Sequence, residues 1–232
     1  MGRTTALLMV ACMLLQGQGS APAQEKNFTV LFKGNLTTRL NPTATDPITR
    51  FQPQEFTNFY GTEIELKYQF TNWNLAVSLS ADYIAVSETR PLRVSFQTEV
   101  PTEDGYEAIP VEITGYFLIP ASGPTVRIFM GGGGGVYFGH RHYSIAGVEA
   151  PVTSSRPGFG IHVVAGLSYY FMSWLSMTAE MKFRDLQFHS TNAFSAAGIP
   201  YGDFFLKIPQ TPFESTVQTD GIVFQLGVGV SF

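Results

Sequence analysis

Residues 221–232 constrain the fold of this chain more than any other stretch. They read Gly-Ile-Val-Phe-Gln-Leu-Gly-Val-Gly-Val-Ser-Phe, so apolar residues alternate with small or polar ones. A period of two is that of a β-strand with one apolar face. Because the sequence stops on this strand, we expect no later segment to cover its edge. A long apolar strand needs both edges paired, and closure into a barrel provides that pairing.

Seven earlier stretches alternate in the same way, at residues 28–40, 56–70, 74–83, 111–119, 125–142, 158–171 and 175–184. Short turns follow the second, fourth and sixth of them. Long connections follow the others, and we interpret 41–53, 144–157 and 189–216 as loops because of their prolines and polar residues. Within the connection 87–110, residues 92–100 alternate, so the flanking strands are expected to run on as a hairpin. We predict an all-β fold, an eight-stranded antiparallel up-and-down transmembrane β-barrel formed by residues 24–232.

Alternation alone does not say which face of the barrel points outward, and a soluble lipocalin-like barrel with its apolar face inside is the alternative. Charged residues make up only 14% of the chain, against about a quarter in soluble domains. Aromatic residues gather near the short turns, as an aromatic belt at a membrane interface would: Phe70, Trp73, Phe171 and Trp174. All short turns lie at one end and all long connections at the other, which is typical of outer-membrane barrels. We therefore expect the apolar face to contact lipid.

Residues 1–23 have the features of a cleaved secretory signal peptide. Arg3 supplies the positive start, residues 6–15 the apolar core, and Ala21-Pro22-Ala23 the cleavage site. The apolar core is too short to span a bilayer as a helix. The single cysteine, Cys12, lies within this segment. A lipoprotein with Cys12 lipidated is the rival interpretation, which the short apolar run before it disfavours.

The eight-strand plan, the signal, the Phe-Met-Ser-Trp-Leu turn at 171–175 and the Gly-Val-Gly-Val-Ser-Phe end resemble the small outer-membrane β-barrels of the OmpX, OmpW and OmpA-barrel type. The resemblance extends over residues 24–232. It implies location in the cell outer membrane, with both termini in the periplasm and outer-membrane lipid as partner. It also implies assembly by the barrel-assembly machinery, which reads a terminal aromatic residue, here Phe232. Since no peptidoglycan-binding domain follows the last strand, we expect no anchoring to the cell wall.

The polar faces of the strands carry charged residues that would point into the lumen: Lys33, Glu63, Glu65, Lys67, Glu112, Arg127, Glu180, Lys182 and Arg184. The interior of an eight-stranded barrel is just wide enough for its own side chains, and charges there must pair or keep water. One interpretation is a structural plug of salt bridges. The other is a narrow or gated path in which the ion pairs exchange partners.

Five consecutive glycines, residues 131–135, remove side chains from both faces of one strand. They provide space for neighbouring aromatics such as Phe129 or Tyr169 and allow local bending. The alternative is a weak point in the wall that opens a cavity or a lateral exit.

Two sets of residues could carry chemistry. His140 and His142 share a strand face and could meet one metal ion, although a metal site needs three or four ligands. His142, Ser144 and Glu149 lie near one loop, and His189 and Ser190 near another, but no strained nucleophile motif marks either set. We expect no cofactor, no metal and no catalysis.

The function that we predict is a non-enzymatic outer-membrane protein with a structural or surface-interaction role and a lumen filled by side chains. Its polar outer loops are candidates for binding an extracellular ligand. A formal charge of −4 argues against nucleic acid as a partner. A narrow channel or carrier for ions or small apolar solutes is the main alternative, and a lipid-modifying enzyme is the third.

Overall fold

The structure is a computed structural model that describes residues 26–44, 55–71, 73–93, 99–120, 125–202, 204–208, 210–219 and 221–232. The predicted signal peptide lies outside these residues. Every regular element among them is a strand: Phe28–Ala44 (β1), Phe56–Gln69 (β2), Leu75–Arg93 (β3), Glu99–Leu118 (β4), Val126–Ile145 (β5), Val148–Glu149 (β6), Val152–Arg156 (β7), Gly158–Met172 (β8), Leu175–Asn192 (β9), Gly198–Tyr201 (β10), Phe204–Lys207 (β11), Phe213–Thr219 (β12) and Ile222–Ser231 (β13). No helix in this part of the chain is long and apolar enough to cross a membrane.

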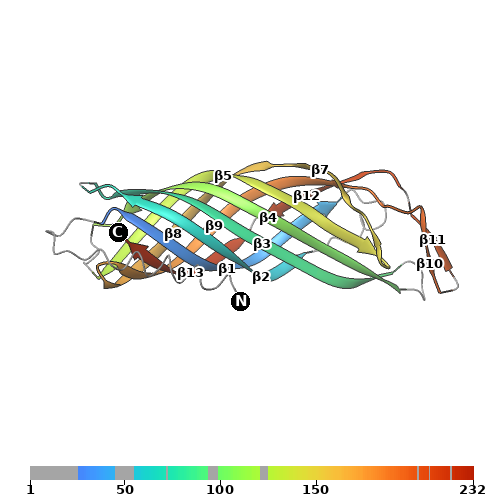
Figure 1. Ribbon diagram of the computed structural model, residues 1–232, viewed down its shortest axis with the longest axis horizontal. Coiled ribbons are helices and arrows are strands. Elements are labelled where there is room, and N and C mark those ends of the chain that lie inside the picture. Colours follow the sequence, from blue (N-terminus) through green and yellow to red (C-terminus); the bar gives the residue numbers. More distant parts are fainter. Residues whose placement is uncertain are drawn as a thin grey trace, which may run out of the picture.

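Eight strand positions form a closed antiparallel ring in the order β1–β2–β3–β4–β5–β8–β9–β13 (Figure 1). The ring closes because β1 pairs with β2 on one side and with β13 on the other, for example Lys33 opposite Glu63 and also opposite Gly227. Two shorter strands, β7 and β12, pair with the outer part of β9 and so continue the ring beyond the ends of two of its strands. β7 continues β8 on one side of β9, and β12 continues β13 on the other. The predicted eight-stranded up-and-down barrel is confirmed.

The apolar face of each strand points out of the barrel and the polar face points in, as the membrane interpretation predicted. Along β3 exposed outward residues alternate with buried inward ones: Leu75, Val77, Leu79 and Tyr83 are exposed, whereas Ser78, Ser80 and Asp82 are buried. The apolar part of this strand matches the roughly 9–11 residues that a tilted strand needs to cross a bilayer. An outward apolar band of this height is the arrangement of a transmembrane barrel.

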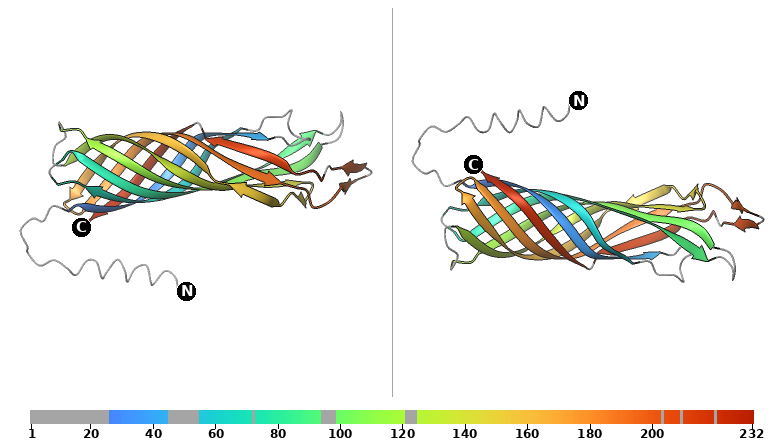
Figure 2. Two further views of the ribbon diagram at one scale, coloured as in Figure 1. Left: turned by 90° about the horizontal axis from the view of Figure 1, so that it is seen from above. Right: turned by 90° about the horizontal axis from the view of Figure 1, so that it is seen from below.

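The two ends of the barrel differ. At one end the strands join through short turns, such as Ser173–Trp174 between β8 and β9, and here Phe232 lies beside Phe28. We call it the short-turn end; the C-terminus lies there (Figure 2). At the opposite, outer end the strands continue well beyond the apolar band, and the β10–β11 hairpin projects farthest (Figure 1).

Two connections that the sequence analysis interpreted as loops contain strands, which is a correction. In the stretch 144–157, β5 runs on to Ile145, turns through Ala146 (φ 47°) and Gly147 (φ 80°) into β6, and is followed by β7. A turn in which both central residues have positive φ matches the twist of the flanking strands and therefore suits a two-residue hairpin. In 189–216, β9 runs to Asn192, and β10, β11 and the start of β12 follow.

The other two long connections, 87–110 and 41–53, also contain strand residues. In 87–110, β3 and β4 form the extended hairpin that the alternation indicated. In 41–53, the described part, residues 41–44, continues β1 and pairs with β12. The strands therefore run farther outward than their apolar faces alone would predict.

Beyond the apolar band the barrel wall separates into two sheets. The β2–β3 ladder ends at Gly61–Ile84, and the β5–β8 ladder ends at Tyr137–Gly158. One outer sheet therefore consists of β3, β4, β5 and β6, and the other of β7, β9, β12, β1 and β2.

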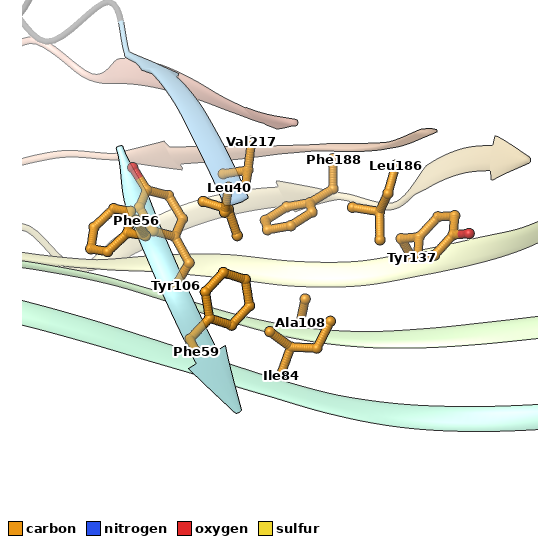
Figure 3. Packing of buried hydrophobic residues seen from close by; sticks show 10 residues of the cluster. All are labelled: Leu40, Phe56, Phe59, Ile84, Tyr106, Ala108, Tyr137, Leu186, Phe188 and Val217. Carbon is orange, nitrogen blue, oxygen red and sulfur yellow. The ribbon is translucent and has the colours of Figure 1, made fainter. Parts of the chain in front are cut away.

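Two apolar layers fill the space enclosed by these outer strands. The inner layer is shown in Figure 3 and contains Leu40, Phe56, Phe59, Ile84, Tyr106, Ala108, Tyr137, Leu186, Phe188 and Val217. The outer layer contains Leu92, Val100, Tyr143, Ile145, Ala150, Phe194, Ile208 and Phe213. The outer half therefore has a hydrophobic core between sheets, like a soluble β-sandwich.

Candidate functional site

The lumen of the membrane-spanning part contains a cluster of buried ion pairs, which we call the charge cluster. Lys33 is central to it. Its ammonium lies 3.1 Å from Glu63 and 2.7 Å from Glu180, and it also pairs with Glu65. Glu63 lies directly across from Lys33 in the β1–β2 ladder, so the register alone places this pair together.

A second group of pairs in the charge cluster is centred on Glu112. Lys182 Nζ lies 2.9 Å from Glu112 and 3.0 Å from Glu63, so it joins this group to the first. Arg184 Nε lies 2.9 Å from Glu112, and its other nitrogens reach Asp82 at 2.7 Å and Glu63 at 3.2 Å. A guanidinium held by three carboxylates has most of its fixed donors used, which suits a fully buried position.

The charge cluster includes polar residues that were not among the predicted site residues, among them Asp82, Asn35 and Gln225. Asp82 accepts from Arg184 at 2.7 Å and from Asn35 Nδ2 at 2.6 Å. Gln225 Nε2 donates to Glu63 at 2.9 Å. Alternation could have assigned each of them to the inner face, but not to a partner, because partners depend on the strand register.

Two buried tyrosines, also absent from the predicted site, donate further hydrogen bonds to the carboxylates. Tyr116 donates to Glu65 at 2.9 Å, and Tyr137 donates to Glu112 at 2.8 Å. Each hydroxyl satisfies one more acceptor site of a buried carboxylate, which stabilises the buried charge.

Lys67 lies at the edge of the charge cluster, toward the short-turn end. Its side chain is 15% exposed, whereas its partners Glu65 and Glu180 are fully buried, and it lies 3.4 Å and 3.8 Å from them. Its ammonium lies over the Tyr116 ring, 4.0 Å from the ring centroid. Lys67 is therefore the least tightly held of the lumen lysines.

Arg127 was predicted as a member of the charge network, and it instead contacts neutral groups. It donates to Gln69 at 2.6 Å and lies over the Tyr170 ring. Within the described residues, the structure thus brings eight of the nine predicted charges into ion pairs and leaves Arg127 outside them. Its position close to the short turns separates it from the carboxylates deeper in the lumen.

On the outer side of the charge cluster the inner apolar layer fills the lumen, and a buried arginine lies beyond it. Arg141 of β5 binds both oxygens of Asp104 at 2.7 and 2.8 Å. It also donates to Ser215 on β12, in the opposite outer sheet, at 2.8 Å. Burial lowers the pKa of Arg141, but Tyr106 and Asp104 outweigh it and raise the pKa above its ordinary value, so Arg141 stays charged. Arg141 therefore connects the two outer sheets.

The glycine run of β5 lies opposite residues 112–116 of β4. A Cβ at Gly133 would overlap the carbonyl oxygen of Ile113, and a Cβ at Gly135 would lie 2.9 Å from the Glu112 side chain. A Cβ at Gly131 would also overlap the β4 backbone. The run therefore makes room for residues of β4.

The two aromatics that the sequence analysis named as neighbours of the glycine run lie elsewhere. Phe129 packs over Gly166 of β8, where an added Cβ would lie 2.8 Å from the ring. Tyr169 is exposed on the outer face of the barrel. The predicted space for these two rings is thus corrected: the space is taken by β4.

The histidines considered as metal ligands lie on the outer surface. His140 is 3.6 Å from Glu107 of the neighbouring strand, and His142 is exposed beside it on β5. Among the described residues, no group of three or more potential ligands could hold a metal ion.

The residues considered for catalysis do not converge either. Ser144 lies opposite Glu149 in the β5–β6 hairpin, but it is buried while Glu149 is exposed. His189 and Ser190 are adjacent on β9 and face opposite sides. Ser190 is buried and donates to Asn192, while His189 bonds Thr216 near the surface.

The predicted aromatic belt residues lie at the short-turn end. Phe70, Trp73 and Phe171 are exposed, and Trp174 is half-buried. Phe70 and Trp73 have ring centroids 6.2 Å apart, and Phe171 packs edge-on against Tyr169.

A second set of exposed aromatics, which sequence reasoning did not recognise as a belt, borders the outer edge of the apolar band: Tyr60, Tyr83, Phe138, Phe159 and Phe183. Aromatic girdles at both edges are typical of transmembrane barrels. The strand register could have revealed this set, because it aligns these positions around the ring.

Comparison with solved structures places this fold among small outer-membrane β-barrels. The outer membrane protein OprG from Pseudomonas aeruginosa is 12% identical, with 90% of this chain and 97% of that chain covered and a TM-score of 0.58. Ail of Yersinia pestis (14% identity, 89% and 99% covered, TM-score 0.48) and the outer membrane protein W of E. coli (13%, 90% and 100%, 0.41) are also similar. No protein-family model and no curated protein matches the sequence. The likeness shows the fold, and it confirms the resemblance drawn from the strand plan.

Proposed function

We propose that this chain is an integral outer-membrane protein with a structural or surface-interaction role and a lumen closed by its own side chains. One observation carries the proposal: the charge cluster is followed, toward the outer end, by the two apolar layers, with Arg141 between the sheets. Ions crossing this lumen would have to separate buried ion pairs and then pass through packed apolar side chains, and both steps are costly.

The outer sheets support the surface-interaction part of the proposal. They extend beyond the apolar band on a rigid scaffold, and their exposed faces carry charged residues such as Arg93, Glu99 and Arg156. Segments that project from a rigid scaffold are where binding residues are often found. The partner would be an extracellular ligand, and outer-membrane lipid would surround the apolar band.

Single-channel recording in a planar bilayer tests the closed lumen. The protein, folded in detergent and shown to be folded by its heat-sensitive gel mobility, is expected to give no steady openings. Steady openings that change in size when Lys67 or Glu180 is neutralised would contradict the proposal and favour a narrow channel. One observation favours this second candidate. The Lys67 ammonium lies farther from Glu65 and Glu180 than the other lumen lysines lie from their carboxylates, so Lys67 can exchange ion-pair partners most easily.

A further inference from the structure

A small cavity opens at the short-turn end of the lumen, below the charge cluster. It has a volume of about 30 Å³, and Lys67, Arg127, Ser168, Tyr170, Ser176 and Thr178 are among the residues that line it. We call it the vestibule. A space of this size holds one or two water molecules, or a monatomic ion of similar size.

The charges that line the vestibule have one sign. Lys67 and Arg127 contribute two cations, and no carboxylate belongs to the described lining. Lys67 forms ion pairs with Glu65 and Glu180, which belong to the charge cluster. Arg127, by contrast, contacts the neutral side chains of Gln69 and Tyr170. The guanidinium has five N–H donors, so its bond to Gln69 leaves donors for a ligand.

We propose that the vestibule binds one small anion of the halide class, between Lys67 and Arg127. The lining hydroxyls supply further donors; Ser168 and Thr178 are already hydrogen-bonded to each other at 2.8 Å. A cation in a partly enclosed space attracts an anion more strongly than it would in bulk water.

The proposal is tested by solution NMR of the whole protein folded in detergent micelles. Sodium bromide replaces sodium sulfate at constant ionic strength, and the amide signals of Ser168, Ser176 and Thr178 are followed. Saturable shifts with bromide or chloride are expected. Arg127→Gln should weaken the binding about tenfold, as loss of a charge-assisted hydrogen bond does. Lys67→Gln should also weaken it.

Lys207→Gln is the matched control, because Lys207 is exposed on β11 at the outer end. It should leave the shifts unchanged. If Lys67→Gln fails to fold because Lys67 also contacts the charge cluster, Arg127→Gln decides alone, since Arg127 lies outside the described ion pairs. Shifts that do not saturate, or that are the same in Arg127→Gln and the unmodified protein, would mean that the vestibule holds only water, and the proposal would be wrong.

Discussion

Glu112 shows at the level of single residues why buried charges in this barrel cannot be removed one at a time. It pairs with both Lys182 and Arg184. Glu112→Gln keeps the shape of the side chain but leaves two buried cations short of a partner. Breaking a buried pair in this way costs about 3–5 kcal/mol. We expect a loss of this order in the free energy of unfolding, measured with urea in lipid vesicles.

Glu107→Gln is the matched control, because Glu107 lies on the outer face of the same strand, where it pairs with the exposed His140. A change within about 0.5 kcal/mol is expected there. Equal losses in the free energy of unfolding for the two substitutions would contradict this prediction. They would show that water reaches the charge cluster and solvates the unpaired cations.

Gly133 illustrates how close approach of the backbone restricts one position. Because a Cβ there would overlap the Ile113 carbonyl, Gly133→Ala should force β4 and β5 apart and lower the yield of folded barrel. At Gly115, on the same strand pair, the nearest atom to an added Cβ is the Gly132 carbonyl oxygen at 3.8 Å, an ordinary contact. Gly115→Ala should therefore fold normally. The heat-sensitive gel mobility measures both, and a normal yield for Gly133→Ala would contradict the argument.

At the level of elements, Arg141 is expected to hold the two outer sheets together. Arg141→Met removes the bonds to Asp104 and Ser215. Amide hydrogen exchange should then become faster in the outer part of β4 while the membrane-spanning strands stay protected, because local opening depends on local contacts. Arg93→Met, which alters an exposed arginine of β3, is the control. Uniformly faster exchange throughout the barrel would contradict a local role.

The strands were predicted well where side chains alternate and poorly in 144–157 and 189–216, where prolines and polar residues suggested loops. The β3–β4 hairpin, which alternation did predict, shows why a proline need not end a strand. Pro91 and Pro101 lie opposite each other in the β3–β4 hairpin. Phe70 N–H donates to the Leu75 carbonyl, so the backbone N–H and C=O groups of odd-numbered residues in β3 point toward β2. The missing N–H of Pro91 therefore lies on the side where the β2–β3 ladder has already ended, and it costs no ladder bond.

The charge cluster was predictable only as a set of inward residues. Alternation assigns Lys33 and Glu63 to the lumen, but the contact of Arg184 on β9 with Asp82 on β3 depends on closure of the whole ring. Arg141 was not among the predicted inward charges, although it lies between His140 and His142. Its inward direction follows from their outward direction, whereas its partner follows only from the register of β4 and β5.

At the level of the whole molecule, the apolar band predicts how the cost of a charge varies with depth in the membrane. Leu79 and Thr89 lie on the same outward face of β3, the first within the apolar band and the second in the outer sheet. A lysine that faces lipid near the bilayer midplane costs about 2–4 kcal/mol, and the cost falls toward the interfaces. Leu79→Lys should therefore lower the free energy of unfolding in lipid vesicles by this amount, whereas Thr89→Lys should leave it nearly unchanged. Equal costs at the two positions would mean that the band between the two aromatic girdles does not lie in the bilayer, since only the surrounding lipid distinguishes these two exposed sites.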